Sequence, residues 1–260
     1  MKLIYVSALL IFTAWSNADK KHQPDSMHMP GAYSMISQRV KTDSMDTTFM
    51  AIKQLKIYTD TYMMYANVNS PDSISSFGIG TYSNNANGVT ENVIFSAGDT
   101  SYSDQPASYQ LAIEKTAKGY IQVIKNMNGQ HVDLTEAYNA VGTTAKTALD
   151  GAWKLIKRYQ VKGKDTSMTM ATQYKTYYAG HVIWGHVWTD DQKKNHTGIG
   201  FGTFSLKGNK VKESMISSTY YEVRNKNFDI DIAMNGKDEF KQTMDNGDGS
   251  RSVEIYSRLK

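Results

Sequence analysis

The sequence of 260 residues contains no cysteine and only 4 prolines. The absence of cysteine excludes a disulfide-stapled scaffold, a cysteine nucleophile and a thiolate metal site. The few prolines exclude a collagen-like or proline-rich linker protein. Aromatic residues make up 11% of the chain, which argues against wholesale disorder. The length allows one large domain or two of about 120 residues, whose stability must come from packing.

Long apolar runs are equally scarce. The only one, Leu3–Trp15, follows the basic start Met1-Lys2 and precedes small residues before Asp19. We therefore predict a signal peptide over residues 1–18, and an exported protein that is periplasmic or secreted. The alternative, a transmembrane anchor, needs about 20 apolar residues and is disfavoured by the shorter run. No other segment is apolar enough to span a bilayer, so we expect no transmembrane segment in the mature chain.

The charges are unevenly divided between the two halves of the chain. Residues 31–142 carry 7 basic and 10 acidic side chains, whereas residues 151–260 carry 18 and 12. The basic residues are scattered among acidic ones and form no stripe interleaved with stacking aromatics. The sequence therefore predicts no nucleic-acid partner.

An internal repeat is the most informative feature of the sequence. Its matching segments are Gly31–Ile36 with Gly151–Ile156, Gln54–Tyr58 with Gln173–Tyr177, Gly78–Ser83 with Gly200–Ser205, and Glu136–Tyr138 with Glu254–Tyr256. The order is kept over about 110 residues, and the offset varies only between 118 and 122. We therefore predict two homologous domains.

The repeat also sets the expected boundaries. Residues 19–30 form a leader, residues 31–141 the first domain, residues 142–150 a short linker, and residues 151–260 the second domain.

Within each copy the hydrophobic pattern has a period of two. Phe228, Ile230 and Ile232 alternate with Asp229 and Asp231. Turn sequences such as Asn-Gly fall between such runs, and no long stretch has the period of a helix. About 110 residues of short antiparallel strands predict a sandwich or a closed barrel.

The repeated motifs resemble those of a known superfamily. Gly31 to Tyr33 and Gly151 to Trp153 resemble the Gly-x-Trp opening of lipocalins and fatty-acid-binding proteins, the calycins, whose aromatic residue plugs one end of the barrel. The fuller set, Gln-x-Lys-x-Tyr, then Gly-x-Gly-Thr-aromatic-Ser and a Glu, resembles lipocalin-like domains of uncharacterised function in exported Bacteroidetes proteins. This resemblance covers both copies. It implies an all-β fold of two similar antiparallel lipocalin-like β-barrels in tandem, and it implies the fold more firmly than an activity.

Candidate ligand-binding residues come from the repeated strands. Gln54 and Lys56, like Gln173 and Lys175, lie two apart and share one face of a strand. If that face lines the barrel, the amide and the ammonium can hold a carboxylate or another polar head group. The alternatives are a polar interior sealed by water and an outward-facing strand with a solvated lysine.

The remaining candidates are glutamates, a histidine and aromatic residues. Glu91 and Glu213 occupy matching positions and can pair structurally with the two lysines. The second copy has His181 and Trp184 where the first has Tyr62 and Tyr65, so we expect the two domains to differ in function. The predicted ligand-binding residues are Gln54, Lys56, Tyr65, Glu91, Gln173, Lys175, His181, Trp184 and Glu213.

No repeated catalytic set and no metal-ligand spacing is visible, so we predict no catalytic residue, no metal and no cofactor. His181 and His186 are five apart on one strand and face opposite sides. Three functions fit the sequence: binding of a small apolar or amphipathic ligand in one or both barrels, an envelope interaction or scaffold role with filled barrels, and hydrolase or isomerase activity through a barrel carboxylate. The ligand and the oligomeric state are not specified by the sequence.

Overall fold

The computed structural model of the chain describes residues 28–68, 75–85, 88–129, 131–142 and 145–260. The expected signal peptide and most of the expected leader lie outside these residues. The described chain is almost entirely β-strand, with 3-10 turns at Met127–Gly129 and Tyr221–Val223. It contains no helix long and apolar enough to cross a membrane.

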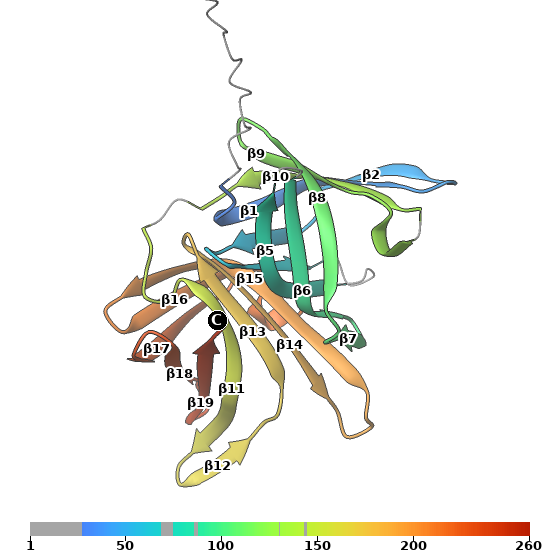
Figure 1. Cartoon of the computed structure of the whole chain (residues 1–260). Coiled ribbons are helices and arrows are strands. Elements are labelled where there is room, and N and C mark those ends of the chain that lie inside the picture. Colours follow the sequence, from blue (N-terminus) through green and yellow to red (C-terminus); the bar gives the residue numbers. More distant parts are fainter. Residues whose placement is uncertain (1–27, 69–74, 86–87, 130, 143–144) are drawn as a thin grey trace, which may run out of the picture.

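The first barrel is an up-and-down meander of antiparallel strands. Its wall consists of β1 (Gly31–Lys41), β3 (Gln54–Tyr58), β4 (Tyr62–Asn67), β5 (Ser76–Asn85), β6 (Gly88–Gly98), β8 (Ala107–Lys115), β9 (Gly119–Ile124) and β10 (Asp133–Ala140). Pairing of β10 with β1 closes the barrel. Two short strands, β2 (Asp46–Met50) and β7 (Ser101–Ser103), pair with β1 and β6 outside this wall, and the β1–β2 hairpin projects away from it (Figure 1).

The second barrel repeats this arrangement. Its wall consists of β11 (Gly151–Lys162), β13 (Thr172–Tyr178), β14 (His181–Thr189), β15 (Asn195–Lys207), β16 (Lys210–Ser218), β17 (Asn227–Asn235), β18 (Glu239–Asp245) and β19 (Ser250–Arg258). Pairing of β19 with β11 closes it, and β12 (Asp165–Met168) takes the place of β2. The predicted fold class, two similar antiparallel lipocalin-like barrels in tandem, is confirmed.

Irregularities of the strands recur at equivalent places. The register shifts between Met35 and Ser37 in β1, as it does between Leu155 and Lys157 in β11. A second shift falls at the second glycine of each Gly-x-Gly motif, where β5 meets β6 and β15 meets β16. Bulges bend and twist a strand, which a small closed barrel requires. The repeat therefore preserves the points of curvature.

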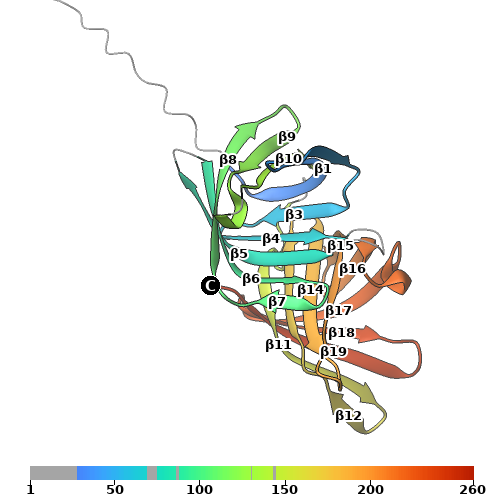
Figure 2. The same ribbon diagram turned by 90° about the vertical axis from the view of Figure 1, so that its right-hand side faces the viewer.

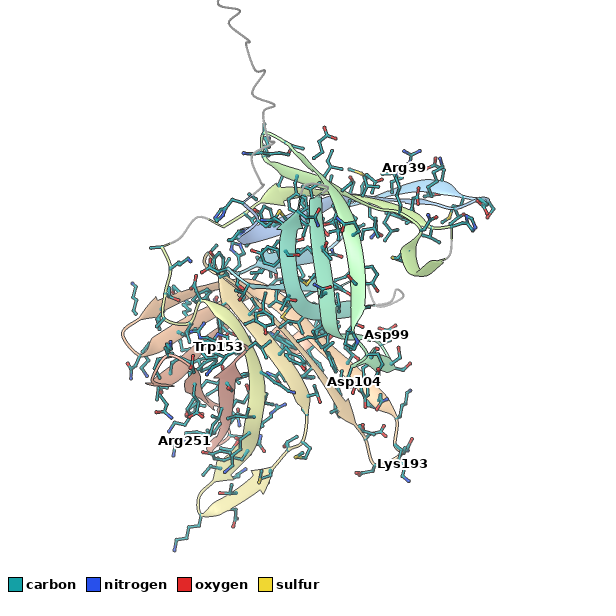
Figure 3. The ribbon with its side chains drawn as sticks, in the orientation of Figure 1. Arg39, Asp99, Asp104, Trp153, Lys193 and Arg251 are labelled. Carbon is teal, nitrogen blue, oxygen red and sulfur yellow. The ribbon has the colours of Figure 1, made fainter. Side chains whose placement is uncertain are left out.

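The aromatic residue of each Gly-x-aromatic opening plugs one end of its barrel. The Trp153 indole donates a hydrogen bond to the Leu149 carbonyl at 2.8 Å, and the Tyr33 hydroxyl donates to the Met29 carbonyl at 3.0 Å. Both rings are buried among other aromatic side chains. Figure 3 shows Trp153 near the start of β11, with Lys193 and Arg251 toward the opposite end of the second barrel. The interior of each barrel is thus filled at one end.

The two barrels pack against each other through the outer faces of their walls. One hydrophobic cluster joins Leu55, Ile57 and Phe77 of the first barrel to Ile183 and Phe201 of the second. The Phe77 ring lies so close to Gly185 that a Cβ there would be 2.5 Å from it. Figure 2 shows β3 to β6 beside β14 and β15. The strands at this interface are buried on both faces, which explains the continuous burial of β3.

Candidate functional site

The Gln-x-Lys-x-Tyr strands carry polar side chains into both barrels. Along β13, Gln173, Lys175 and Tyr177 point inward, while the residues between them face the other barrel. This alternation follows from the period of two in a strand. Lys175 is only 3% exposed, so its ammonium needs partners inside the protein. The structure therefore places the Gln-x-Lys face toward the barrel interior.

In the second barrel the ammonium of Lys175 has two hydrogen-bond acceptors. Its Nζ lies 3.1 Å from Glu213 Oε1 and 3.2 Å from Gln242 Oε1. The Tyr177 hydroxyl donates to the same Glu213 oxygen at 2.5 Å. The pairing of lysine and glutamate that the sequence left open is therefore present in the structure.

The hydrogen bonds continue across the barrel. Gln242 Nε2 donates to Glu254 Oε2 at 2.7 Å, and the Tyr256 hydroxyl donates to the same oxygen at 2.5 Å. Gln173 Nε2 donates to the Tyr256 hydroxyl at 2.5 Å. These side chains and those around Lys175 form one connected layer, here called the polar floor, above the aromatic plug.

The first barrel contains the same floor, residue for residue. Lys56 Nζ lies 2.7 Å from Glu91 Oε1 and donates to Gln122 Oε1 at 3.2 Å. Tyr58 donates to Glu91, and Gln122 donates to Glu136 at 2.5 Å.

Two more bonds complete the match. Tyr138 donates to Glu136 Oε2 at 2.8 Å, and Gln54 donates to the Tyr138 hydroxyl at 2.6 Å. Each contact has its counterpart in the second barrel, so the duplication extends to the buried polar chemistry.

One position breaks the match. In the second barrel Arg158 Nε lies 3.4 Å from Glu254 Oε1, forming an ion pair. In the first barrel the equivalent residue is Gln38, whose Nε2 donates to Glu136 Oε1 at 2.8 Å. When this position is included, the second floor combines two cationic and two carboxylate side chains, whereas the first combines one cationic side chain with two carboxylates.

The tyrosines of both floors act as hydrogen-bond donors. Burial, and next the nearby Glu213 carboxylate, raise the pKa of Tyr177 well above its ordinary value. The pKa of Tyr58 is raised in the same way by burial and Glu91. Burial and the adjacent glutamates likewise raise the pKa values of Tyr138 and Tyr256. A neutral phenol donates its proton to a carboxylate, so these residues hold the glutamates in place.

Above its polar floor the second barrel has a cavity of about 190 Å³. The floor residues form its base, and Met215, Phe228, Ile230 and Met244 form an apolar wall. Gln173 Oε1 is buried in this lining without a hydrogen-bond partner among the described residues. A cavity of this kind offers an apolar volume with one free acceptor.

Aromatic rings surround this cavity on β14 and near β16. The Trp184 ring lies against Gly200, where a Cβ would be 2.4 Å from it, and stacks on Tyr220 with centroids 6.0 Å apart. His186 Nε2 lies 2.8 Å from the Tyr220 hydroxyl. Burial, and next the charge of Arg158, lower the pKa of His186 to about 4. The imidazole is therefore neutral near pH 7 and contributes a polar, uncharged surface.

The first barrel has a cavity of about 230 Å³ above its own floor. Its lining is more polar and includes Asn67, Ser76 and Ser96. Tyr65 lies against Gly78 as Trp184 lies against Gly200. The two cavities thus share a base and differ in their walls.

The structure brings eight of the nine residues expected from the sequence to these cavities. Gln173, Lys175, Trp184 and Glu213 line the second cavity, and Gln54, Lys56, Tyr65 and Glu91 line the first. His181 is the exception. It lies on the opposite face of β14 from Trp184, because residues three apart on a strand face opposite sides, and its Nδ1 is 3.2 Å from the Ala179 carbonyl.

Several lining residues were not identified from the sequence. They are Arg158, His186, Tyr220, Gln242 and Glu254 in the second cavity, and Gln38, Gln122 and Glu136 in the first. The repeat contained a signal for some of them, since Gln122 and Gln242 are 120 residues apart and Glu136 and Glu254 are 118 apart. Among the residues that the structure describes, no three His, Asp or Glu side chains gather where they could hold a metal ion.

A scan against protein-family models and a search of the curated proteins each gave no match. Among solved structures, the chain is similar to a lipocalin-like protein from Bacteroides uniformis ATCC 8492, with 13% identity and a TM-score of 0.30, over 44% of this chain and 100% of that one. It is also similar to a protein of unknown function from the DUF3598 family of Nostoc punctiforme PCC 73102, with 10% identity and a TM-score of 0.25, over 88% of this chain and 96% of that one. The chain itself folds into two closed, eight-stranded antiparallel barrels in tandem.

Proposed function

We propose that this is an exported protein, periplasmic or secreted, that binds a small amphipathic molecule in the cavity of the second barrel. Export is supported by the signal-like segment at residues 1–18. Ligand binding is supported by the cavity itself, which combines a polar base, an apolar wall and aromatic rings. Such a combination is typical of sites that orient a small molecule by a few polar groups.

The observation that carries the proposal is the free Oε1 atom of Gln173. Its amide nitrogen is fixed on Tyr256, so the oxygen cannot turn away without losing that bond. A buried acceptor without a partner costs about 1–3 kcal/mol. The oxygen is closed to solvent, so a ligand hydroxyl or N–H group that moves the covering side chains aside and donates to it would recover that cost.

The charges of the floor define the class of ligand. The two cationic side chains, Arg158 and Lys175, are each paired with a glutamate, so the floor has no excess charge. An anionic head group would have to compete with Glu213 for Lys175, and a cationic one would have to compete with Lys175 for Glu213. We therefore propose a neutral head group that donates a hydrogen bond.

The volume limits the ligand further. Pockets for drug-sized molecules measure about 300–1,000 Å³, whereas an apolar cavity of about 150 Å³ takes up benzene. At about 190 Å³ the second cavity fits a single ring or a short chain and is too small for a long acyl chain.

Calorimetric titration of the full chain with phenol and with anisole tests this proposal. The two probes share the ring, but anisole lacks the hydroxyl donor. Phenol is expected to bind with one site per chain and at least about fivefold more tightly than anisole, because only phenol can donate to Gln173 Oε1. Absence of phenol binding, or equal binding of both probes, would contradict the proposal.

A cavity-filling variant locates the site. Met244→Phe adds volume to the cavity wall without touching the polar floor, and is expected to abolish phenol binding. Met168→Phe, which makes the same change at an exposed position of β12, is the control and should bind as the unmodified chain does.

The second candidate is an interaction or scaffold protein of the envelope. It is favoured by one observation, namely that the aromatic plug and the polar floor already fill much of each barrel. This candidate predicts that neither phenol nor anisole binds in the barrels. The same titration therefore separates the two functions.

A further inference from the structure

The first barrel contains a buried carboxylate without a cationic partner. Glu136 is 6% exposed and accepts hydrogen bonds from Gln38, Gln122 and Tyr138. Among the described residues, no Lys, Arg or His side chain forms an ion pair with it. Its counterpart Glu254 has Arg158 beside it at 3.4 Å, so the absence of a cation is specific to the first barrel.

The cation of the first polar floor, Lys56, is already paired with another carboxylate. Lys56 lies 2.7 Å from Glu91 and is joined to Glu136 only through Gln122. All three groups that contact Glu136 are hydrogen-bond donors, the arrangement that an ionised carboxylate requires. The interior of the first barrel therefore carries one negative charge in excess. Burying an uncompensated charge is costly, and a cation in the adjacent space would lower that cost.

That space exists. Glu136 lines the cavity of about 230 Å³, together with the rings of Tyr65 and Tyr109. The faces of phenol rings attract cations. Asn67 Oδ1 is buried in the same lining and has no hydrogen-bond partner among the residues that the structure describes. It would become an acceptor for an N–H donor if the side chains that close it to solvent moved aside.

From these observations we propose that the cavity of the first barrel binds a small organic cation of the primary ammonium class, with Glu136 as its counter-charge. The cavity accommodates an ammonium carrying a short alkyl chain, whose methylene groups would contact Val93, Ile124 and Leu134. The net charge of residues 31–142, 7 basic against 10 acidic side chains, would attract such a cation to this half of the molecule. This inference does not depend on the ligand of the second barrel.

Titration of the full chain with n-butylammonium chloride and with n-butanol, at constant ionic strength, tests the inference. Butylammonium is expected to bind with one site per chain and at least about tenfold more tightly than butanol, because only the cation can pair with Glu136. If butylammonium does not bind, or binds no better than butanol, the inference is overturned.

Two variants assign the binding to the proposed site. Glu136→Gln removes the charge and is expected to weaken butylammonium binding at least about tenfold. Gln38→Arg introduces the guanidinium that the second barrel holds at the equivalent place, and is expected to abolish binding. Glu114→Gln, the same change at an exposed carboxylate of β8, should leave binding unchanged. If butylammonium binding is unchanged in both Glu136→Gln and Gln38→Arg, the assignment of binding to this cavity is overturned.

Gln38→Arg keeps the test decisive if Glu136→Gln fails to fold, since the second barrel folds with arginine at that place. Circular dichroism and the melting temperature report the fold of each variant. The reverse change, Arg158→Gln, leaves Glu254 without its cation and should create a second butylammonium site. If the number of sites stays at one, the excess charge does not determine binding.

Discussion

The lysine at the centre of each polar floor joins two roles, because it supports the fold and also forms the base of a cavity. Lys175 and Glu213 are both nearly inaccessible to solvent, at 3% and 4% exposure. Removing one partner of such a pair leaves the other as an unpaired charge in a medium that solvates it poorly. The stability of the fold and the shape of the cavity therefore depend on the same side chains.

Lys175→Met is expected to lower the free energy of unfolding by about 3–5 kcal/mol, because Glu213 is left buried without its cation. Denaturant unfolding measures this loss. The double variant Lys175→Met with Glu213→Gln should recover part of it, since no charge then remains unpaired. Lys241→Met, at an exposed position of β18, is the control and should change stability by less than about 0.5 kcal/mol. A cost for Lys175→Met as small as that of the control would contradict the structural role of the pair.

His186 is expected to make stability depend on pH. Its pKa is lowered from 6.5 to about 4 in the folded protein, mainly by burial. Between these values the unfolded chain binds more protons, so the free energy of unfolding falls as the pH falls from about 6.5 to about 4. The loss is on the order of 2 kcal/mol.

Denaturant unfolding at a series of pH values measures this slope. His186→Asn, which introduces the residue found at the equivalent position of the first barrel, should reduce the slope in this window, leaving the part due to His181, whose pKa burial also lowers. His131→Asn, at an exposed position, should leave it unchanged. Curves of equal slope for His186→Asn and the unmodified chain would show that His186 is not the group responsible.

At the scale of the element, the Gly-x-Gly strands β5 and β15 combine two requirements. The first glycine leaves room for an inward aromatic ring, and the second sits at a shift in register where the neighbouring backbone comes very close. At Gly202 a Cβ would lie 2.2 Å from the Ser214 carbonyl oxygen. That oxygen belongs to the backbone of β16 and cannot move aside without disturbing the ladder.

Gly202→Ala is therefore expected to destabilise the protein by roughly 3 kcal/mol, at the upper end of what overpacking costs. Gly163→Ala is the comparison. This glycine has a φ of +60° and open space around it, so its substitution should cost only about 1 kcal/mol. Thermal unfolding of the two variants measures the difference. If Gly202→Ala lowers the free energy of unfolding no more than Gly163→Ala does, the backbones of β15 and β16 do not approach each other closely at Gly202.

The sequence allowed the elements to be predicted better than the contacts between them. The inward direction of Gln173 and Lys175 follows from a period of two, which is a local property of the strand. The partners Gln242 and Glu254 come from β18 and β19, far along the chain, and reach Lys175 and Arg158 only because the barrel closes. His181, which was expected among the ligand-binding residues, does not line the cavity, since an odd separation on one strand puts it on the opposite face from Trp184.

At the scale of the molecule, the two barrels share a hydrophobic cluster. Phe77 of the first barrel fits against Gly185 of the second, and the Phe95 and Tyr174 rings lie 5.1 Å apart. Interfaces of this apolar kind are typical of parts that unfold together rather than independently. We therefore expect the two barrels, with their two different cavities, to unfold together as one structural unit.

Phe77→Ala tests this coupling. The substitution leaves a void at the interface and is expected to destabilise the protein by about 3–5 kcal/mol. Beyond residue 28 the tryptophans, Trp153, Trp184 and Trp188, all belong to the second barrel, so their fluorescence reports its unfolding. The melting temperature seen by this fluorescence should fall, although the change is in the first barrel. Phe49→Ala, at an exposed position of β2, is the control. A fluorescence transition unaffected by Phe77→Ala would show that the barrels unfold independently.

We propose that the polar floor common to both barrels supports a ligand cavity in the second. A crystal structure of the full chain grown with phenol tests it most directly. We expect one phenol in the cavity of the second barrel, with its hydroxyl within hydrogen-bond distance of Gln173 Oε1 and its ring against Met215 and Met244. A cavity filled by its own side chains, or one without phenol, would show that the second barrel does not bind a ligand in this way.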